Sequence, residues 1–345
     1  MPQKKSKNKI KNYKPFVSVC TPTFNRRPFI EYMIKCFNHQ DYPKDRMEWI
    51  IIDDGTDKIG DLVKDIPEVK YFPYDKKMPL GEKRNIMHEK SKGSILVYMD
   101  DDDYYPPTRV SHAVERLRAN PDALCAGSSE MYIYFKHINK MYQFGPYGPN
   151  HATAGTFAFK RELLKNHSYE NHASLAEEKA FLKNYTVPFV QLHPLHSILV
   201  FSHSHNTFDK KKLLDNQNPN FVKESSKTVD MFIKDAEMKD FYMNKIEKRL
   251  ENYAPGRPEM KPDVIKYMLE IEGERKKQLL ELQQNQNQKQ IVFQEGNNPP
   301  QALTMEQIVQ ILQQQKNEIN YLMNQIKGKD IEIELLTKQL NISNI

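Results

Sequence analysis

Hydrophobic and polar positions alternate with two different periods along the first two thirds of the chain. Short apolar runs at residues 16–20 (FVSVC), 48–53 (EWIIID) and 95–99 (ILVYM) have the length and composition of buried strands. Between them, helical spacing places five apolar residues on one face, namely Phe29, Tyr32, Met33, Cys36 and Phe37. A second helix is predicted from Leu80 to Lys90. Strands that alternate with crossover-length helices predict an α/β fold with a largely parallel sheet.

The pattern changes in the second half of this region and again after it. Residues 124–159 are rich in Tyr and Phe with Gly and Pro breaks, which predicts antiparallel strands of the same domain. Residues 209–283 are charged and helical in period, interrupted at residues 254–263 (APGRPEMKPD), and form a predicted helical extension. A Gln/Asn/Pro-rich linker at 284–302 follows. The main domain is therefore expected at residues 15–208, after a basic tail at 1–14.

Residues 303–345 carry a heptad repeat. From Met305 to Leu340 the seam positions follow a 3,4 spacing without a break, with Ile prominent at the a positions and Leu at d. That mixture favours a parallel two-stranded coiled coil, although Gln315 and Lys329 weaken it at two d positions. The alternative is a surface helix packed on its own domain, which would show a wider and less regular stripe. We expect a homodimer through this segment.

Composition narrows the functional class. The 345 residues are 39% hydrophobic, which is enough for a full core. The formal net charge of +6 comes from six lysines in the first fourteen residues, and the rest of the chain has 45 basic and 45 acidic residues. A nucleic-acid partner is therefore disfavoured. Three separated cysteines encode neither a disulfide framework nor a zinc site, and the sequence shows no signal peptide or membrane span. We expect a soluble, cytoplasmic protein.

The strongest chemical signal is the run of four aspartates, Asp100–Asp103, directly after an apolar strand. Adjacent carboxylates repel one another, and a hard divalent cation such as Mn²⁺ or Mg²⁺ is an economical counter-charge. On an extended stretch Asp100 and Asp102 can point to the same side. A solvated acidic loop or a stray calcium site is the alternative reading.

Two further polar clusters follow predicted strands. The pair Asp53 and Asp54 precedes Gly55 and could accept hydrogen bonds from a base or a ribose, or simply form a turn. Residues 21–26 (TPTFNR) offer hydroxyls, the Asn25 amide and the Arg26 guanidinium where a phosphate or base would lie, or form a loop leading into a helix. Because ligands of α/β sheets bind at the carboxyl ends of strands, these clusters are expected to form one site.

Together the three clusters resemble the family 2 glycosyltransferases of the GT-A fold. The resemblance covers residues 16–208: VSVCTPTFNR matches the nucleotide-binding opening, IIIDDGTD the Asp-Asp-Gly-Ser turn, and GEKRNIMHEKSKGSILVYMDDDD the stretch that ends in the Asp-x-Asp motif. It implies a GT-A domain that transfers a sugar from a nucleotide-sugar, with a UDP-sugar favoured, to a glycan, protein or lipid acceptor.

The resemblance also implies roles for single residues. Thr21, Thr23 and Asp53 or Asp54 would contact uridine, and Arg84 would lie near the nucleotide. Asp100 would lie near the ribose and, with Asp102, bind the metal on the diphosphate. Asp101 would belong to the nucleotide-binding residues, and Asp103 would assist. An inverting transfer needs a base that deprotonates the acceptor hydroxyl.

Residues 176–181 (AEEKAF) resemble the Glu-Asp-x-x-Phe acceptor motif of this family, with Glu for Asp. This assigns Glu178 as the base, with Glu177 beside it; an exposed pair at a helix start is the alternative. HSHNT at 203–207 resembles the His-x-x-Asn-Thr segment, which selects His203 over His205 for the metal or diphosphate. His193 and His196 are expected to be structural, and Gly155 to allow a close backbone approach.

Two other classes stay open at this stage. A nucleotidyltransferase would use the same carboxylates but normally needs a glycine-rich or cationic triphosphate cradle, and the first loop has no glycine. An inactive transferase-like scaffold, dimerised by its tail, would lack turnover.

Overall fold

The computed structural model describes residues 14–173, 178–215, 218–288, 291–294 and 301–342. The chain divides after Glu270 into two compact units. No helix of the described residues has the length and apolar character needed to cross a bilayer. Cys20, Cys36 and Cys125 are buried free thiols.

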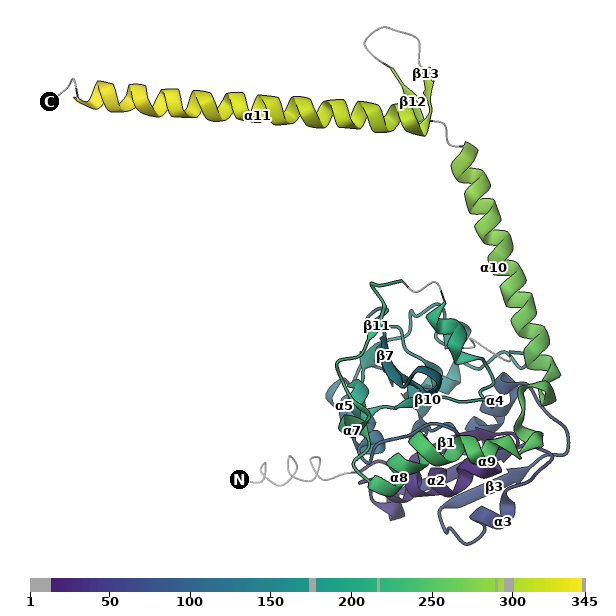
Figure 1. The fold of residues 1–345 in the computed structure, drawn as a ribbon. Coiled ribbons are helices and arrows are strands. Elements are labelled where there is room, and N and C mark those ends of the chain that lie inside the picture. Colours follow the sequence, from purple (N-terminus) through teal and green to yellow (C-terminus); the bar gives the residue numbers. More distant parts are fainter. Residues whose placement is uncertain (1–13, 174–177, 216–217, 289–290, 295–300, 343–345) are drawn as a thin grey trace, which may run out of the picture. The chain divides into compact units, whose positions relative to one another are not determined.

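A seven-stranded mixed sheet forms the centre of the first unit (Figure 1). Its strand order is β3-β2-β1-β4-β8-β5-β9. The first four strands are mutually parallel, and β8 runs antiparallel to both of its neighbours. The strands are β1 (Val17–Thr23), β2 (Met47–Asp53), β3 (Val69–Pro73), β4 (Ile95–Tyr98), β5 (Cys125–Gly127), β8 (Ala158–Lys160) and β9 (Phe189–Gln191). The predicted α/β class is confirmed. β2 is buried along its whole length, which explains the continuous apolar run at its centre, residues 49–52.

The crossover helices cover both faces of this sheet. They are α2 (Arg27–Asn38), α3 (Gly60–Val63), α4 (Leu80–Lys90), α5 (Arg109–Ala119) and the short α6 (Glu178–Phe181). All five residues predicted on the apolar face of the first helix are buried in α2, and α4 has the predicted bounds. One apolar core lies between the sheet, α2 and α5, and a second contains Met87 of α4 together with Phe157, Phe159 and Phe181.

A second sheet, of order β10-β6-β7-β11, packs onto the first of these cores. It consists of β6 (Met131–Phe135), β7 (Lys140–Phe144), β10 (Val200–Ser202) and β11 (Val222–Glu224). β7 is antiparallel to β6 and β11, whereas β10 is parallel to β6. The Tyr/Phe-rich segment therefore forms antiparallel strands, as predicted, but mostly in a sheet of its own. Short helical turns connect these elements: Lys44–Arg46, Lys136–Ile138, Ala154–Thr156, Arg161–Lys165, Pro194–His196, Lys210–Leu214, Ala254–Gly256 and Pro258–Met260.

The segment after residue 208 continues the same core. In Figure 1 the helices α8 (Ala236–Asp240) and α9 (Ile246–Glu251) lie alongside α2, joined by a π-helical turn at Phe241–Lys245. The Phe241 ring stacks on Tyr32 of α2 at 3.6 Å between centroids. Phe232 of α7 (Val229–Phe232) is also buried. The domain boundary predicted at residue 208 thus does not divide the core. The apolar side chains of the charged segment that follows it pack against the sheet domain itself.

The second unit is made of helices and a strand pair. Helix α10 (Pro262–Gln288) starts in the first unit, β12 (Ile291–Phe293) pairs antiparallel with β13 (Gln301–Leu303), and α11 spans Met305–Ile342. The predicted linker therefore contains the end of a helix and two short strands. Helix α11 covers most of the predicted coiled-coil segment, and its seam side chains Leu312, Ile319 and Ile326 are 57–60% exposed in the single chain.

Candidate active site

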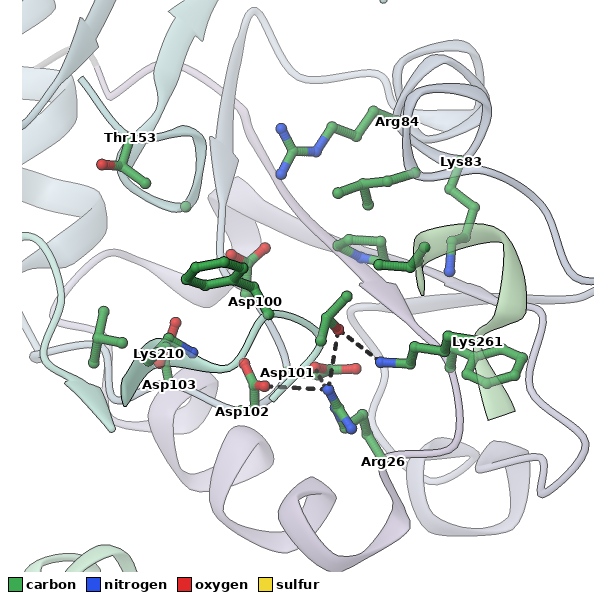
Figure 2. A pocket seen from close by; sticks show the side chains of 18 of the residues that line it. Arg26, Lys83, Arg84, Asp100, Asp101, Asp102, Asp103, Thr153, Lys210 and Lys261 are labelled. Atoms are coloured by element: carbon green, nitrogen blue, oxygen red, sulfur yellow. Dashed lines mark hydrogen bonds and ion pairs between the residues drawn. The ribbon is translucent and has the colours of Figure 1, made fainter. Parts of the chain in front are cut away.

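A cavity of about 300 Å³ opens at the carboxyl ends of β1 and β4. It brings together Asp100–Asp103, Arg26, Arg84 and Gly155 of the residues predicted from the sequence (Figure 2). It also contains charged and polar residues that the sequence did not single out, namely Lys77, Lys83, Thr153, Thr207, Lys210, Lys261 and Asp263. The predicted aspartates thus face a pocket of mixed charge.

Hydrogen bonds of two buried side chains, Tyr105 and Arg109, hold the start of the aspartate run in place. The backbone N–H of Asp100 donates to the Tyr105 hydroxyl at 2.7 Å, and that hydroxyl donates to the Gly155 carbonyl at 3.1 Å. The buried Arg109 side chain donates from Nη2 to the carbonyl of Tyr98, the last residue of β4. These bonds connect the end of the strand, the start of the run and the opposite wall of the cavity, so the position of Asp100 depends on all three.

Two carboxylates of the run lie beside Arg26. Its Nε is 3.5 Å from Asp101 Oδ1 and its Nη2 is 3.4 Å from Asp102 Oδ2. Burial acts to raise the pKa of Asp102, but the hydrogen bond with His203 and the charge of Arg26 hold that pKa well below its usual range. Burial raises the pKa of Asp101 to about 7, with Arg26 opposing the rise and the Asp102 charge adding to it. Asp102 therefore has the lower pKa of this pair.

Asp103 has a buried carboxylate oxygen, Oδ1, without a hydrogen-bond partner among the described residues. Burial and then the charge of Asp102 raise its pKa well above the ordinary value. An orphaned carboxylate oxygen beside other carboxylates is chemically suited to a hard divalent cation. Among the residues that the structure describes, however, no three His, Cys, Asp or Glu side chains are arranged closely enough to hold a metal ion by themselves. The donor set fits a cation that takes its remaining ligands from water or a phosphate.

His203 is buried with both ring nitrogens in contact with protein groups. Nε2 lies 3.3 Å from Asp102 Oδ2 and 2.8 Å from Asn206 Nδ2, and Nδ1 accepts from the backbone N–H of His205 at 3.2 Å. Burial lowers the pKa of His203 to about 3. In this structure the ring is thus a neutral partner of Asp102, and direct metal ligation would require it to exchange these contacts. His196 is remote from the run, and its Nδ1 pairs with the Thr108 hydroxyl at 2.7 Å.

The predicted uridine contacts support the neighbouring loops. Thr21 is fully buried, donates to the Met99 carbonyl at 2.7 Å and accepts from Trp49 Nε1 at 2.9 Å. Asp53 accepts from the backbone N–H groups of Gly55 and Ile59, at 2.9 and 3.0 Å. Neither side chain lines the cavity.

The other three members of these clusters lie closer to the cavity wall. Asp54 forms a buried ion pair with Lys83 at 2.7 Å. Asn25, with φ of 52°, accepts from the backbone N–H of Asp57 through Oδ1 and donates to the Pro255 carbonyl through Nδ2. Thr23 is buried beside Asp101. None of the three lines the cavity; Asp54 acts on it through Lys83, Asn25 through the Pro255 segment and Thr23 through Asp101.

The candidate base Glu178 is the first residue of α6 and is partly buried. It does not line the cavity. Phe181 of the same helix stacks on Tyr169 at 4.2 Å and anchors α6 to the core. Glu177, the alternative base, lies outside the described residues.

The residues that sequence reasoning missed are mainly lysines. Lys83 precedes Arg84 in α4, and the strand-end rule does not single out helix residues. Lys261 comes from residues 254–263, which the sequence marks only as a break between helices. The proline and glycine of that break indicate a turn region, and its contacts with distant loops are what direct Lys261 to the cavity.

Comparison with known proteins shows where this domain belongs. Residues 18–182 match the sequence model of the family described as "Glycosyl transferase family 2". This part of the chain belongs to family 2. The glycosyltransferase domain accordingly contains the three strand-end clusters and α6, whereas Thr207, Lys210 and Lys261 of its cavity come from outside the matched region.

Curated relatives match the glycosyltransferase domain over short segments. The GalNAc(5)-diNAcBac-PP-undecaprenol beta-1,3-glucosyltransferase of Campylobacter jejuni is 38% identical over 96 residues, 26% of this chain and 30% of that protein. The putative teichuronic acid biosynthesis glycosyltransferase TuaG of Bacillus subtilis is 30% identical over 109 residues, 30% of this chain and 42% of that protein. The chain thus spans less than half the length of these relatives.

Solved structures of glycosyltransferases are also similar to this chain. TarS 1–349 of S. aureus in complex with UDP-GlcNAc has a TM-score of 0.43 at 19% identity, covering 54% of this chain and 58% of that chain. The mannosyltransferase PcManGT of Pyrobaculum calidifontis, in complex with GDP-Man and Mn²⁺, has a TM-score of 0.45 at 17% identity, covering 70% and 74%.

Proposed function

We propose that this protein is a metal-dependent, inverting glycosyltransferase that uses a nucleotide-sugar donor, with a UDP-sugar favoured. The observation that carries the proposal is the aspartate run at the end of β4, which lines one cavity with Arg26, Arg84 and several lysines inside a family 2 domain. A pocket with both carboxylates and cations is suited to a metal–diphosphate pair, in which the cation contacts the acids and the phosphates contact the bases.

Asp100 and Asp102 would hold the divalent cation, Mn²⁺ or Mg²⁺, and Asp103 would be an additional ligand. When bound, the ion supplies positive charge to the leaving diphosphate. The protein's own contribution is orientation and charge. Arg26 and Arg84 approach from different sides of the cavity (Figure 2), so that a diphosphate between them is fixed in direction before the sugar bond breaks.

Glu178 is the proposed base that takes the proton of the acceptor hydroxyl. Because Glu178 does not line the cavity, we expect the acceptor to approach from the side of α6 and to reach the sugar at the mouth of the cavity. Glu177 stays the alternative. The acceptor itself is proposed only as a glycan, protein or lipid hydroxyl.

The test is hydrolysis and transfer with a panel of UDP- and GDP-sugars, with and without Mn²⁺, on the wild type and on Asp102→Ala. We expect metal-dependent release of UDP or GDP by the wild type and loss of release by at least about 100-fold in the variant. Asp230→Ala, at an exposed residue paired with Lys239, is the matched control and should retain activity. Preference for a nucleoside triphosphate would indicate a nucleotidyltransferase, and absence of any turnover would indicate a scaffold.

We also propose that α11 joins two copies of the chain. The support is the unbroken heptad spacing together with the exposure of its described seam residues, including Leu322 at 50%. Removal of residues 303–345 should convert a dimer into a monomer that still hydrolyses donor, as measured by light scattering. An unchanged mass distribution would refute the coiled coil.

A further inference from the structure

Residues 253–264 lie outside the region that matches family 2, and they form part of the cavity wall. This segment is attached to the rest of the domain at both ends. The Tyr253 hydroxyl donates to Asp57 Oδ2 at 2.8 Å, and the Pro255 carbonyl accepts from Asn25 Nδ2 at 2.8 Å. At the other end, Lys77 Nζ lies 2.6 Å from Asp263. These contacts join the segment to the loops that follow β1 and β2 and to the approach to α4, so its position relative to the cavity is fixed at both ends.

Lys261 lies between these two attachments and is only 6% exposed. Its Nζ donates to the Thr207 hydroxyl at 2.7 Å, which is its one hydrogen-bond acceptor among the described residues. Figure 2 shows the Lys261 side chain next to Arg26, and both residues line the cavity. An ammonium group removed from water is costly unless an anion compensates it.

The neighbouring carboxylates already have other partners. Arg26 lies within 3.5 Å of both Asp101 and Asp102, and Lys83 is paired with Asp54. Lys261 forms no ion pair with a described carboxylate. Burial and then the charge of Arg26 hold the pKa of Lys261 well below its usual range, while the charges of Asp101 and Asp102 oppose that shift. The chain therefore supplies a buried, anchored amine beside Arg26 whose hydrogen-bond capacity is unfilled, facing a cavity of about 300 Å³, and an anion bound there would favour its charged form.

We propose that Lys261 binds a phosphate oxygen of the donor's diphosphate, and that residues 253–264 are thereby part of the donor site. This rests on the proposed function. A diphosphate brings two or more negative charges into a space lined by Arg26, Lys261 and Lys210, and an ammonium binds phosphate as a point charge without strict geometry. A lysine serving only as counter-ion to the aspartates would be expected to contact a carboxylate directly instead of a hydroxyl.

The experiment is titration calorimetry of the full chain with UDP and with inorganic pyrophosphate, each in EDTA and in Mn²⁺. The variants are Lys261→Gln, Lys261→Met and Lys261→Arg. Met has a similar length and no charge to bury, so it keeps the test valid if the Gln variant unfolds. Lys140→Gln is the matched control, because it removes one paired lysine charge from the exposed first residue of β7. Thermal unfolding checks the fold of each variant.

We expect Lys261→Gln and Lys261→Met to weaken both ligands by about 10- to 100-fold, as the loss of a charged hydrogen bond predicts. Arg should restore most of the affinity, and binding of uridine, which has no phosphate, should not change. Equal weakening of uridine and UDP would identify a structural role and overturn the inference. UDP affinity within twofold of the wild type in the Gln or Met variant would also overturn it, while leaving the proposed function intact. If the wild type binds neither UDP nor pyrophosphate in Mn²⁺, both the inference and the proposed UDP-dependent function fall.

Discussion

Gly155 gives the sharpest test of the aspartate run, because its substitution moves a carboxylate without changing its charge. A Cβ at this position would lie 2.7 Å from Asp100 Oδ2, whereas ordinary contacts begin at 3.4 Å. The other neighbours, Ile198 Cδ1 and the Tyr105 hydroxyl, are at an acceptable 3.5 Å. In Gly155→Ala the Asp100 carboxylate must therefore shift by about 0.7 Å. It can do so by rotation, since it is the end of a side chain.

The fold should tolerate this shift and the site should not. We expect the free energy of unfolding to change by less than about 1 kcal/mol. A displacement of this size exceeds the tolerance of a preorganised site, so kcat/KM and metal-dependent affinity for the donor should each fall by about 10- to 100-fold. Chemical denaturation and calorimetry with UDP and Mn²⁺ measure the two effects separately.

Gly148→Ala is the matched control for this prediction. Its Cβ would meet only the His151 Cβ, at 4.0 Å, so stability and affinity should both stay near the wild-type values. If Gly155→Ala binds UDP and Mn²⁺ as tightly as the wild type, the position of Asp100 does not matter for donor binding, and the reasoning above is refuted.

Three further predictions address other parts of the domain. Glu178→Gln should lower turnover by about 100-fold with donor affinity kept, and unchanged turnover would transfer the base role elsewhere. Thr21→Val should cost about 1–3 kcal/mol of stability, because Trp49 Nε1 loses its buried acceptor, without weakening donor binding by the folded protein; a loss of affinity alone would favour the uridine contact. Burial, aided by Arg84 and Arg161, lowers the pKa of His88 to about 3 from 6.5. Below pH 6.5 the unfolded chain then binds more protons, so the free energy of unfolding should fall as the pH falls toward 3, and His88→Gln should flatten this dependence in pH-resolved denaturation. Equal slopes in the two proteins would contradict that account.

The parts of the fold that sequence predicted are those set by local periodicity. The buried face of α2 follows from apolar spacing, and β2 is evident from the apolar run 49–52, whereas α4 has almost no apolar face and buries Lys83, Arg84 and His88 beside Met87. The cavity position follows from the polar residues after β1 and β4, because parallel strands end at one edge of the sheet. These predictions needed no knowledge of distant contacts.

Long-range contacts explain what the sequence left out. Thr21 follows the apolar run of the predicted strand, like a ligand contact, yet it lies inside β1 and its hydroxyl accepts from the buried Trp49 of the neighbouring strand β2. Lys261 lies 235 positions after Arg26 in the sequence, and only the bonds of residues 253–264 to the first loops bring the two together. The helices after residue 208 are recognisable from their periodicity. The spacing of their apolar residues does not indicate which surface of the domain covers them.

The apolar core continues from α2 into α8 and α9, and this determines the shortest fragment of the domain that is expected to fold by itself. A fragment ended at the family match or at residue 208 would leave Tyr32 without Phe241 and expose several buried aromatic rings to water. Such a fragment is expected to aggregate during expression and to yield misleading negative results in activity assays. A terminus near residue 270 keeps the apolar contacts and the cavity wall together, and it is the natural choice for crystallisation.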